Sequence, residues 1–205
     1  MNFLAHIYLS GEDEGLKIGN FIGDYVKGKG YLDYPGNISK GIILHRYIDS
    51  FTDSHPMVKA AMQPLRPGYG RYSGIVVDII FDHFLAKYWD NFSSHQLHDF
   101  IHNAHVVFLS NFRLLPWRVK QFLPFLIQNR RLASYSSKKG VRRALVLMSK
   151  YTSLPSKADF AIQVLEKDEA LLQEYFYSFM KDIVLYVENE FSIEVSKPSA
   201  QPMPA

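Results

Sequence analysis

Residues 75–86 read IVVDIIFDHFLA, a stretch in which three ionisable residues, Asp78, Asp82 and His83, stand among large apolar side chains. The apolar residues would cover nearly every side of a helix, which predicts a helix buried in the core. A buried carboxylate without a partner is costly or shifts its pKa instead. These groups therefore need a compensating cation, which either lysine and arginine side chains or a bound divalent metal can supply.

The rest of the chain shows the same helical spacing of apolar residues. Helices are predicted over residues 2–10, 15–26, 38–52, 95–110, 116–129 and 140–151, and one long helix over 158–191. No segment alternates polar and apolar residues as a half-buried strand does. We therefore expect an all-α fold, a helical bundle with one domain over residues 1–191, and a disordered tail over residues 192–205.

The composition is that of a globular protein without cysteine. Of the 205 residues, 47% are hydrophobic and 15% aromatic, which is enough for a sizeable core. No apolar run approaches the roughly 18 residues of a transmembrane helix, and the first residues lack the pattern of a secretory signal. The missing cysteines exclude disulfides and thiolate chemistry and fit the cytoplasmic location that we expect.

Positive charge is concentrated in the second half of the chain. Residues 100–158 contain eleven lysines and arginines but no aspartate or glutamate, whereas the whole chain has a net charge of +3. Such a block attracts an acidic partner, which is a nucleic acid, an anionic lipid or an acidic protein. A merely solvated surface would not need to exclude acidic residues over so long a stretch.

Isolated ionisable residues also stand in other apolar segments. With the three in residues 75–86 they make seven candidate metal ligands: His6, Asp24, His45, Asp49, Asp78, Asp82 and His83. One such histidine alone is more often a satisfied core residue than a ligand, but seven together favour a metal site. Carboxylates with some imidazole suit Mn²⁺, Mg²⁺ or Fe²⁺ better than a thiolate-rich structural zinc site.

Arginines near these residues indicate the group that the site binds. Arg46 follows His45, and Arg66 and Arg71 precede the helix that carries Asp78. An arginine can hold a phosphate with two hydrogen bonds, although each could also be a surface residue. Because a metal lowers the pKa of bound water, the candidate metal ligands and these arginines together favour hydrolysis of a phosphate ester. His55 is a candidate proton donor to the leaving oxygen, although its Asp-Ser-His-Pro context is equally explained as a helix start.

Four ordered blocks, MNFLAHIYLS, GNFIGDYVKG, GIILHRYIDSFTDSHP and RYSGIVVDIIFDHFLAKYW, closely resemble the bacterial acyl carrier protein phosphodiesterases, also called acyl carrier protein hydrolases. The blocks span about residues 1–90, and beyond them the resemblance is in length and in helical, basic character. It implies an all-helical fold like a divergent HD-type metal-dependent phosphohydrolase, a group named for a His-Asp doublet. Here Asp82 precedes His83, so HD-type ligand roles do not transfer position by position.

The resemblance implies an enzyme that hydrolyses the 4′-phosphopantetheine group from holo-acyl carrier protein. The products would be the apo protein and 4′-phosphopantetheine, with Mn²⁺ as the usual cofactor and Mg²⁺ as a substitute. Acyl carrier protein is small and strongly acidic, so we expect it to dock on the basic region 113–157. We predict that Asp24, His45, Asp82 and His83 bind the metal and that His6, Asp49 and Asp78 are further ligands or orient them.

Two alternatives stay open from the sequence. The first keeps the metal site and makes the protein an HD-type nucleotide phosphohydrolase. The second, less favoured, is a basic nucleic-acid-binding protein, for which the chain offers no recognised motif. We expect neither a membrane nor a nucleic acid as a partner, and the oligomeric state does not follow from the sequence.

Overall fold

The computed structural model describes residues 2–128 and 131–198, and over these residues it contains helices but no β-strand, which confirms the predicted all-α fold. The α-helices are α1 (Phe3–Tyr8), α2 (Glu14–Ile22), α3 (Gly36–Ser54), α4 (Pro56–Met62), α5 (Arg66–Tyr69), α6 (Ser73–Lys87), α7 (Leu97–Ser110), α8 (Trp117–Gln128), α9 (Arg131–Ser134), α10 (Lys138–Tyr151), α11 (Ala158–Lys167) and α12 (Glu169–Phe191). Short 3₁₀ helices join them: η1 (Gly23–Tyr25), η2 (Gly30–Asp33), η3 (Gln63–Leu65), η4 (Gly70–Tyr72), η5 (Trp89–Asn91) and η6 (Phe112–Leu114). Within the described ranges, no helix combines the length and the apolar character that crossing a bilayer requires.

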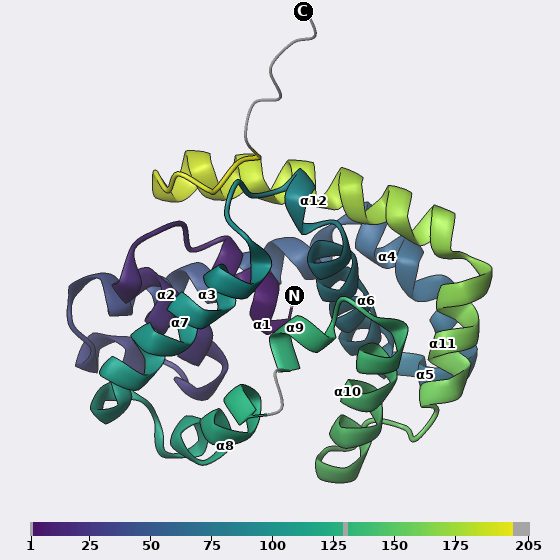
Figure 1. Cartoon of the computed structure of the whole chain (residues 1–205), viewed down its shortest axis with the longest axis horizontal. Helices are drawn as coiled ribbons and strands as arrows, with labels where there is room; N and C mark the ends of the chain where they lie inside the picture. Colours follow the sequence, from purple (N-terminus) through teal and green to yellow (C-terminus); the bar gives the residue numbers. More distant parts are fainter. Residues whose placement is uncertain (1, 129–130, 199–205) are drawn as a thin grey trace, which may run out of the picture.

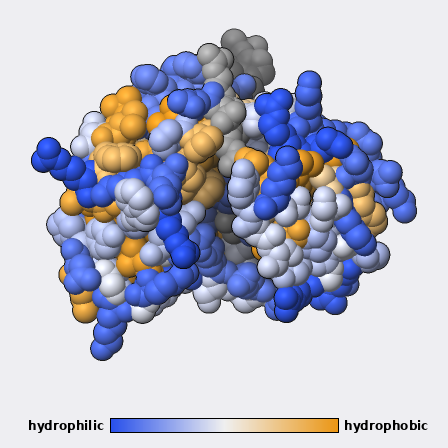
Figure 2. Space-filling model, turned by 90° about the horizontal axis from the view of Figure 1, so that it is seen from below, coloured by the Kyte–Doolittle hydropathy of each residue, from blue (hydrophilic) through white to orange (hydrophobic). Residues whose placement is uncertain are grey.

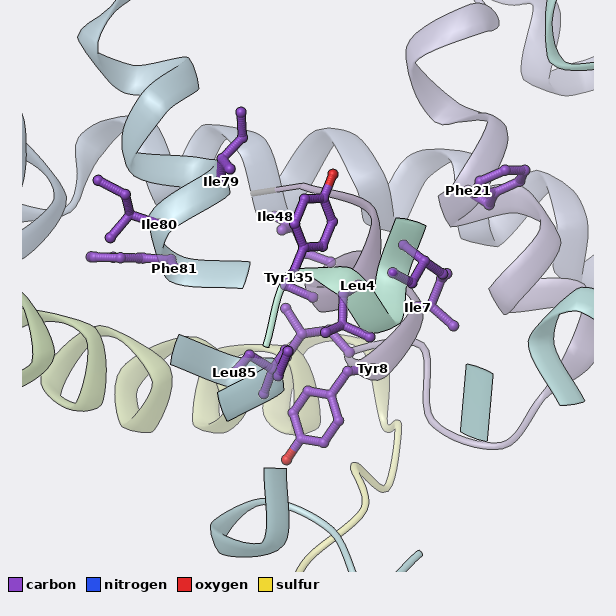
Figure 3. Packing of buried hydrophobic residues seen from close by; sticks show 14 of the residues in the cluster. Leu4, Ile7, Tyr8, Phe21, Ile48, Ile79, Ile80, Phe81, Leu85 and Tyr135 are labelled. Carbon is purple, nitrogen blue, oxygen red and sulfur yellow. The ribbon is translucent and has the colours of Figure 1, made fainter. Parts of the chain in front are cut away.

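Helix α1 lies in the middle of the molecule, with α12 along one edge and α8 at the opposite edge (Figure 1). Figure 3 shows Leu4 and Ile7 of α1 between Leu85 of α6 on one side and Phe21 of α2 on the other. All four side chains are fully or almost fully buried in one apolar cluster that includes residues from α1 to the segment after α12. The first helix is therefore a core element, which explains why the short segment is so apolar.

Helices α2 and α3 cross at a contact between two glycines. A Cβ atom on Gly19 would overlap the carbonyl oxygen of Ile38 and lie 2.8 Å from the Cα atom of Gly41. One turn further along, a Cβ atom on Gly23 would overlap the ring of His45. The missing side chains let the two backbones approach closely, and this approach brings the end of α2 and η1 next to His45.

The prediction of one helix over residues 158–191 is wrong. Helix α11 ends at Lys167 and α12 begins at Glu169, whose carboxylate binds Lys87 of α6 at 2.6 Å and Lys138 of α10 at 2.7 Å. The change of direction lets α11 pack against α10 while α12 packs against α3, α4 and α6. A single straight helix could not bury both apolar faces, and the periodicity of apolar residues does not report such a corner.

The prediction of a disordered tail from residue 192 fails for its first part. Ile193 and Val195 are buried in the core, and the hydroxyl of Tyr8 donates a hydrogen bond of 2.8 Å to the carbonyl oxygen of Ser196. Two apolar residues in alternation are enough to hold an extended segment against α1, a signal too short to stand out in the sequence. The remainder of the predicted tail, residues 199–205, lies outside the described residues.

Substitution of Gly19 by alanine tests the close contact between α2 and α3. We expect Gly19→Ala to lower the free energy of unfolding by about 2 kcal/mol or more, because the new methyl group meets backbone atoms that cannot move aside. Gly74→Ala is the matched control, since its Cβ atom would meet only the end of Met62 at 3.9 Å. This control should leave stability unchanged or raise it by up to about 1 kcal/mol. Equal effects of the two substitutions in urea denaturation would contradict the contact.

Candidate functional site

The position of His6 depends on how the buried helix α1 is held. The backbone N–H groups of Leu4 and Ala5 donate to the two carboxylate oxygens of Asp82 at 2.9 and 3.1 Å. The first N–H groups of a helix have no partner inside the helix, and in a buried helix they need one from elsewhere. Asp82 of α6 therefore caps α1 across the core, and this contact fixes the register at which α1 presents His6.

Three candidate ligands converge at one point. The Nε2 atom of His6 lies 3.3 Å from one carboxylate oxygen of Asp49, and the Nε2 atom of His45 lies 3.1 Å from the other. A nitrogen or oxygen from each of the three residues lies within 4.8 Å of the others. In octahedral or tetrahedral coordination, ligand atoms at about 2.1 Å from one ion lie roughly 3.0–3.4 Å apart. The spacing of these three groups therefore fits a single metal ion.

Asp24 adds a second carboxylate beside this group. One of its oxygens lies 3.5 Å from the Nε2 atom of His45, and 65% of its side chain is exposed. Asp49 is 40% exposed, whereas both imidazoles are almost fully buried. The cluster of His6, Asp24, His45 and Asp49, called the His-Asp cluster below, thus has a buried imidazole side and a carboxylate side that solvent reaches.

Both imidazoles are held in one tautomer by a residue that the sequence analysis did not select. The Nδ1 atom of His6 lies 2.7 Å from the side-chain oxygen of Asn20, and the Nδ1 atom of His45 lies 2.8 Å from the backbone carbonyl of the same residue. The amide nitrogen of Asn20 donates to the carbonyl of His6 and to Ser10, which fixes the orientation of the amide. Two acceptors require two donors, so each Nδ1 atom carries the proton.

In the neutral ring this tautomer leaves a lone pair on Nε2, and the two Nε2 atoms face the His-Asp cluster. Both are buried, and within the described residues neither makes a well-aligned hydrogen bond, although each lies within 3.3 Å of Asp49. The rings stack at 4.2 Å between centroids, with 19° between their planes. Histidine ligands of metals characteristically donate their other N–H group to a carbonyl or carboxylate, as these two do. The residues therefore fit a bound divalent cation, and the carboxylates suit Mn²⁺, Mg²⁺ or Fe²⁺.

The electrostatics of the cluster also favour a cation. Burial lowers the pKa of His6 to about 4, so this imidazole is neutral near pH 7. Burial opposes charge on His45 too, but the neighbouring carboxylates of Asp24 and Asp49 outweigh it and raise the pKa of His45 to about 9, so a metal that binds Nε2 would replace a proton there. Burial likewise opposes charge on Asp49, yet His45 and His6 hold the pKa of that carboxyl well below its usual range. The two carboxylates thus stabilise positive charge at the Nε2 atom of His45.

Asp78 lies at the edge of the cluster. Burial raises the pKa of this carboxyl, and the negative charges of Asp49 and Asp53 raise it further. Asp78 is thus within electrostatic range of Asp49. Its assignment as a further ligand stays a prediction.

The structure does not bring the other two candidate ligands, Asp82 and His83, into the cluster. Asp82 uses both oxygens on the first N–H groups of α1. The Nδ1–H group of His83 donates to the carbonyl oxygen of Tyr135 at 2.6 Å and so holds the segment before α10. Burial lowers the pKa of His83, which keeps the imidazole neutral in this core position. Their contacts are those of residues that position α1 and α10.

The predicted catalytic residues also have structural contacts. The N–H group of Met57 donates to Nδ1 of His55, so the proton of that imidazole is on Nε2. This Nε2–H group donates to Asp182 at 3.2 Å, and His55 thus caps α4 and connects it to α12. Arg46 donates to the carbonyl oxygen of Val26 at 2.9 Å.

Arg66 and Arg71 are exposed near α5, on a segment that packs against Phe160 of α11. Arg71 donates to the hydroxyl of its neighbour Tyr72. In the described part of the chain, no hydrogen bond or ion pair connects Arg66 or Arg71 to the His-Asp cluster.

Fold and site together define a class of protein: an all-helical protein with a half-buried cluster of two histidines and two aspartates in the arrangement of a metal site. The family model described as acyl carrier protein phosphodiesterase matches residues 1–183. The chain belongs to this family, which confirms the resemblance seen in the sequence. Its relation to the HD-type hydrolases stays a prediction.

Curated proteins give the same result. The chain is 36% identical over 137 residues to the acyl carrier protein phosphodiesterase of Yersinia pestis, a match that covers 66% of this chain and 71% of the relative. It is 31% identical to that of Enterobacter sp. (strain 638), over 93% of this chain and 99% of the relative. The protein of the same name from Photorhabdus laumondii is 29% identical over 93% and 96% of the two chains. No solved structure matches the chain.

Metal titration tests the assignment of ligands. We expect purified protein, freed of metal with a chelator and dialysed, to bind Mn²⁺, and His45→Ala to weaken that affinity by about 100-fold or more because a ligand is lost. His98→Ala is the control, since that histidine lies on α7 and its side chain is 82% exposed. Isothermal titration calorimetry measures both variants. Wild-type affinity in His45→Ala, or an equal loss in His98→Ala, would rule out the proposed site.

The role of Asp82 as a cap is tested by the pH dependence of stability. Burial raises the pKa of Asp82 to about 7, although the N–H groups of Leu4 and Ala5 oppose this shift. A carboxyl with a raised folded-state pKa contributes stability below its unfolded pKa near 4 and loses it as pH rises through about 7. We therefore expect Asp82→Asn, in the presence of chelator, to be less stable than wild type at pH 5.

That difference should shrink by roughly 2–4 kcal/mol between pH 5 and pH 8, because only the wild type carries the titrating carboxyl. Asp90→Asn, an exposed change just beyond α6, should show no such narrowing. Urea denaturation at the two pH values gives both comparisons. A difference that stays constant or grows with pH would show that Asp82 does not titrate as a buried cap.

Proposed function

We propose that this protein is a metal-dependent phosphodiesterase that removes the 4′-phosphopantetheine group from holo-acyl carrier protein. Membership of the acyl carrier protein phosphodiesterase family supports the substrate. The observation that carries the proposal is the pair of buried Nε2 atoms of His6 and His45, which face the carboxylate of Asp49 at 3.3 and 3.1 Å and, within the described residues, make no well-aligned hydrogen bond. Such an arrangement suits hydrolysis of a phosphate ester with the help of a metal.

Mn²⁺, with Mg²⁺ or Fe²⁺ as alternatives, would be held by His6, His45, Asp49 and Asp24. When bound, it lowers the pKa of water and neutralises charge on phosphoryl oxygens. In the reaction, the bond between phosphorus and the serine oxygen of the carrier protein breaks, water supplies the new oxygen on phosphorus, and the serine oxygen takes up a proton. The products are the apo carrier protein and 4′-phosphopantetheine.

The residues of this chain would orient the reactants. Asn20 holds both imidazoles in the tautomer that faces the site, so they need no rearrangement during the reaction. The exposed side of Asp24 and Asp49 marks the side from which a phosphodiester can approach. Arg46 lies over the ring of Tyr31 and binds the backbone just after η1. It thereby holds the segment that carries Asp24, and a direct contact of Arg46 with the phosphate stays a prediction.

The basic region 113–157 is our proposed docking region for the acidic carrier protein. Most of its lysines and arginines are exposed on α8, on α10 and on the segments beside them, where they can attract negative charge. Arg130 and the side chain of Arg131 lie outside the described residues. Steering of this kind raises the association rate and falls with ionic strength.

The first experiment incubates the purified protein with holo-acyl carrier protein and Mn²⁺ and follows the intact mass of the carrier. We expect the mass of the phosphopantetheine group to be lost, and chelator to prevent the loss. Asp24→Ala and Asp49→Ala should lower the rate by about 100-fold or more, because each removes a carboxylate from the cluster. Asp90→Asn should turn over at the wild-type rate.

Three outcomes would contradict the proposal in different ways. Turnover that persists in the presence of chelator would contradict the proposed metal dependence. Wild-type rates in Asp24→Ala and Asp49→Ala would place the chemistry elsewhere. No turnover by folded, metal-loaded protein, together with hydrolysis of cyclic or polyphosphorylated nucleotides, would favour the nucleotide phosphohydrolase.

A further inference from the structure

Exposed apolar side chains gather where α7 ends and α8 begins. Together with the basic residues around them they form one surface, called the α8 surface below, which consists of Leu109, Phe112, Arg113, Leu114, Trp117, Arg118 and Lys120. Trp117 is 71% exposed, an unusual position for the largest apolar side chain. Figure 2 shows hydrophobic residues on the left-hand lobe, the side of the molecule on which α7 and α8 lie in Figure 1.

The fold does not require these side chains. Helix α8 attaches to the core through Val119, Leu123 and Leu126, which are all buried. Trp117 lies at the first position of the helix and points away from that face. Exposed aromatic side chains flanked by charge are characteristic of sites that bind another protein.

The α8 surface borders the His-Asp cluster. The ring of Phe122, on the inner side of α8, contacts the rings of Phe3 and Tyr25 at 5.6 and 5.8 Å between centroids. Tyr25 directly follows Asp24, the most exposed member of the cluster. The guanidinium of Arg118 is close enough to act electrostatically on the hydroxyl of Tyr25. Helix α8 therefore packs directly beside the residue that follows Asp24.

The positive charge of the basic region is not equally available along the chain. Lys138 is bound to Glu169 at 2.7 Å, and Arg142 to Asp159 at 2.6 Å. Among the ion pairs of residues 2–128 and 131–198, none includes Arg113 or Arg118. Lys120 donates to the carbonyl oxygen of Arg113, and its Nζ atom lies 5.8 Å from the centre of the Phe112 ring. Within the same residues Lys139, Arg143, Lys150 and Lys157 are also outside these ion pairs, so Arg113 and Arg118 differ from them in the group of exposed apolar side chains that surrounds them.

We propose that the α8 surface is the docking site of the acidic carrier protein, an inference that rests on the proposed function. The phosphorus to be attacked is bonded to a serine side chain, so it lies within one side chain's length of the carrier backbone. The carrier must then touch the surface around the cluster, and α8 lies at that surface through the contact of Phe122 with Tyr25, next to Asp24. An acidic amphipathic helix would place apolar residues on Trp117 and Leu114 and carboxylates on Arg113 and Arg118.

Binding of apo-acyl carrier protein to the metal-loaded full-length chain tests this inference without depending on turnover. We expect Trp117→Ala and Arg118→Glu each to raise the Kd, measured by fluorescence anisotropy at low salt, by about tenfold or more. The matched controls are Leu185→Ala, an apolar side chain 48% exposed on α12, and Lys181→Glu, an exposed charge on the same helix. Both controls should stay within about twofold of wild type, because neither side chain belongs to the α8 surface.

The outcomes separate the docking site from the proposed function. Equal Kd values for all four variants, with holo-carrier still hydrolysed, would overturn the docking site and leave the function standing. A Kd that rises only in Trp117→Ala and Arg118→Glu, with no hydrolysis by any protein, would support the docking site and defeat the function. Binding to anionic phospholipid vesicles that is lost in Trp117→Ala, with an unchanged Kd for the carrier, would make the surface a lipid site and overturn the inference.

Discussion

The structure depends on how a helix of six residues is held in the middle of the core. The N–H groups of Leu4 and Ala5 in α1 belong to fully buried residues, away from water, and the carboxylate of Asp82 accepts both of them. A carboxylate in this position carries a cost of burial, which its raised pKa reflects. In return, the contact fixes the orientation of α1, because only one rotation of the helix about its axis satisfies both carboxylate oxygens. That rotation presents His6 to α2 and α3.

The site is then completed by the crossing of α2 and α3. Their contact at Gly19 and Gly41 places the backbone and side chain of Asn20 against the two imidazoles. One residue therefore sets the tautomer of both histidines, with its side chain for one and its main chain for the other. The two Nε2 atoms are directed at Asp49 by the packing of three helices, so the geometry of the cluster is a property of the core rather than of a loop.

Much of this arrangement could be predicted from the sequence, because the apolar periodicity of each helix is strong and isolated ionisable residues stand out against it. The same signal could not separate His6 and His45 from Asp82 and His83. A buried ionisable residue in an apolar helix either binds a ligand or forms a hydrogen bond with a backbone group. Which of the two it does depends on the groups that the fold places opposite it. Asn20 was missed because an amide has no charge, although a fully buried amide between two glycines needs partners for the same reason.

The distribution of charge along the chain is a second feature whose meaning depends on the fold. Residues 100–158 lack acidic residues, yet the carboxylates that neutralise part of this block lie just beyond its end. They are Asp159 at the start of α11 and Glu169 at the start of α12, and both bind residues of α10. A count along the chain gives every lysine and arginine the same weight. In space, the unneutralised charge of Arg113 and Arg118 accompanies exposed aromatic side chains beside the site. Ion pairing within the fold thus neutralises Lys138 and Arg142, and the exposed apolar side chains beside Arg113 and Arg118 distinguish the surface that we propose for the carrier protein.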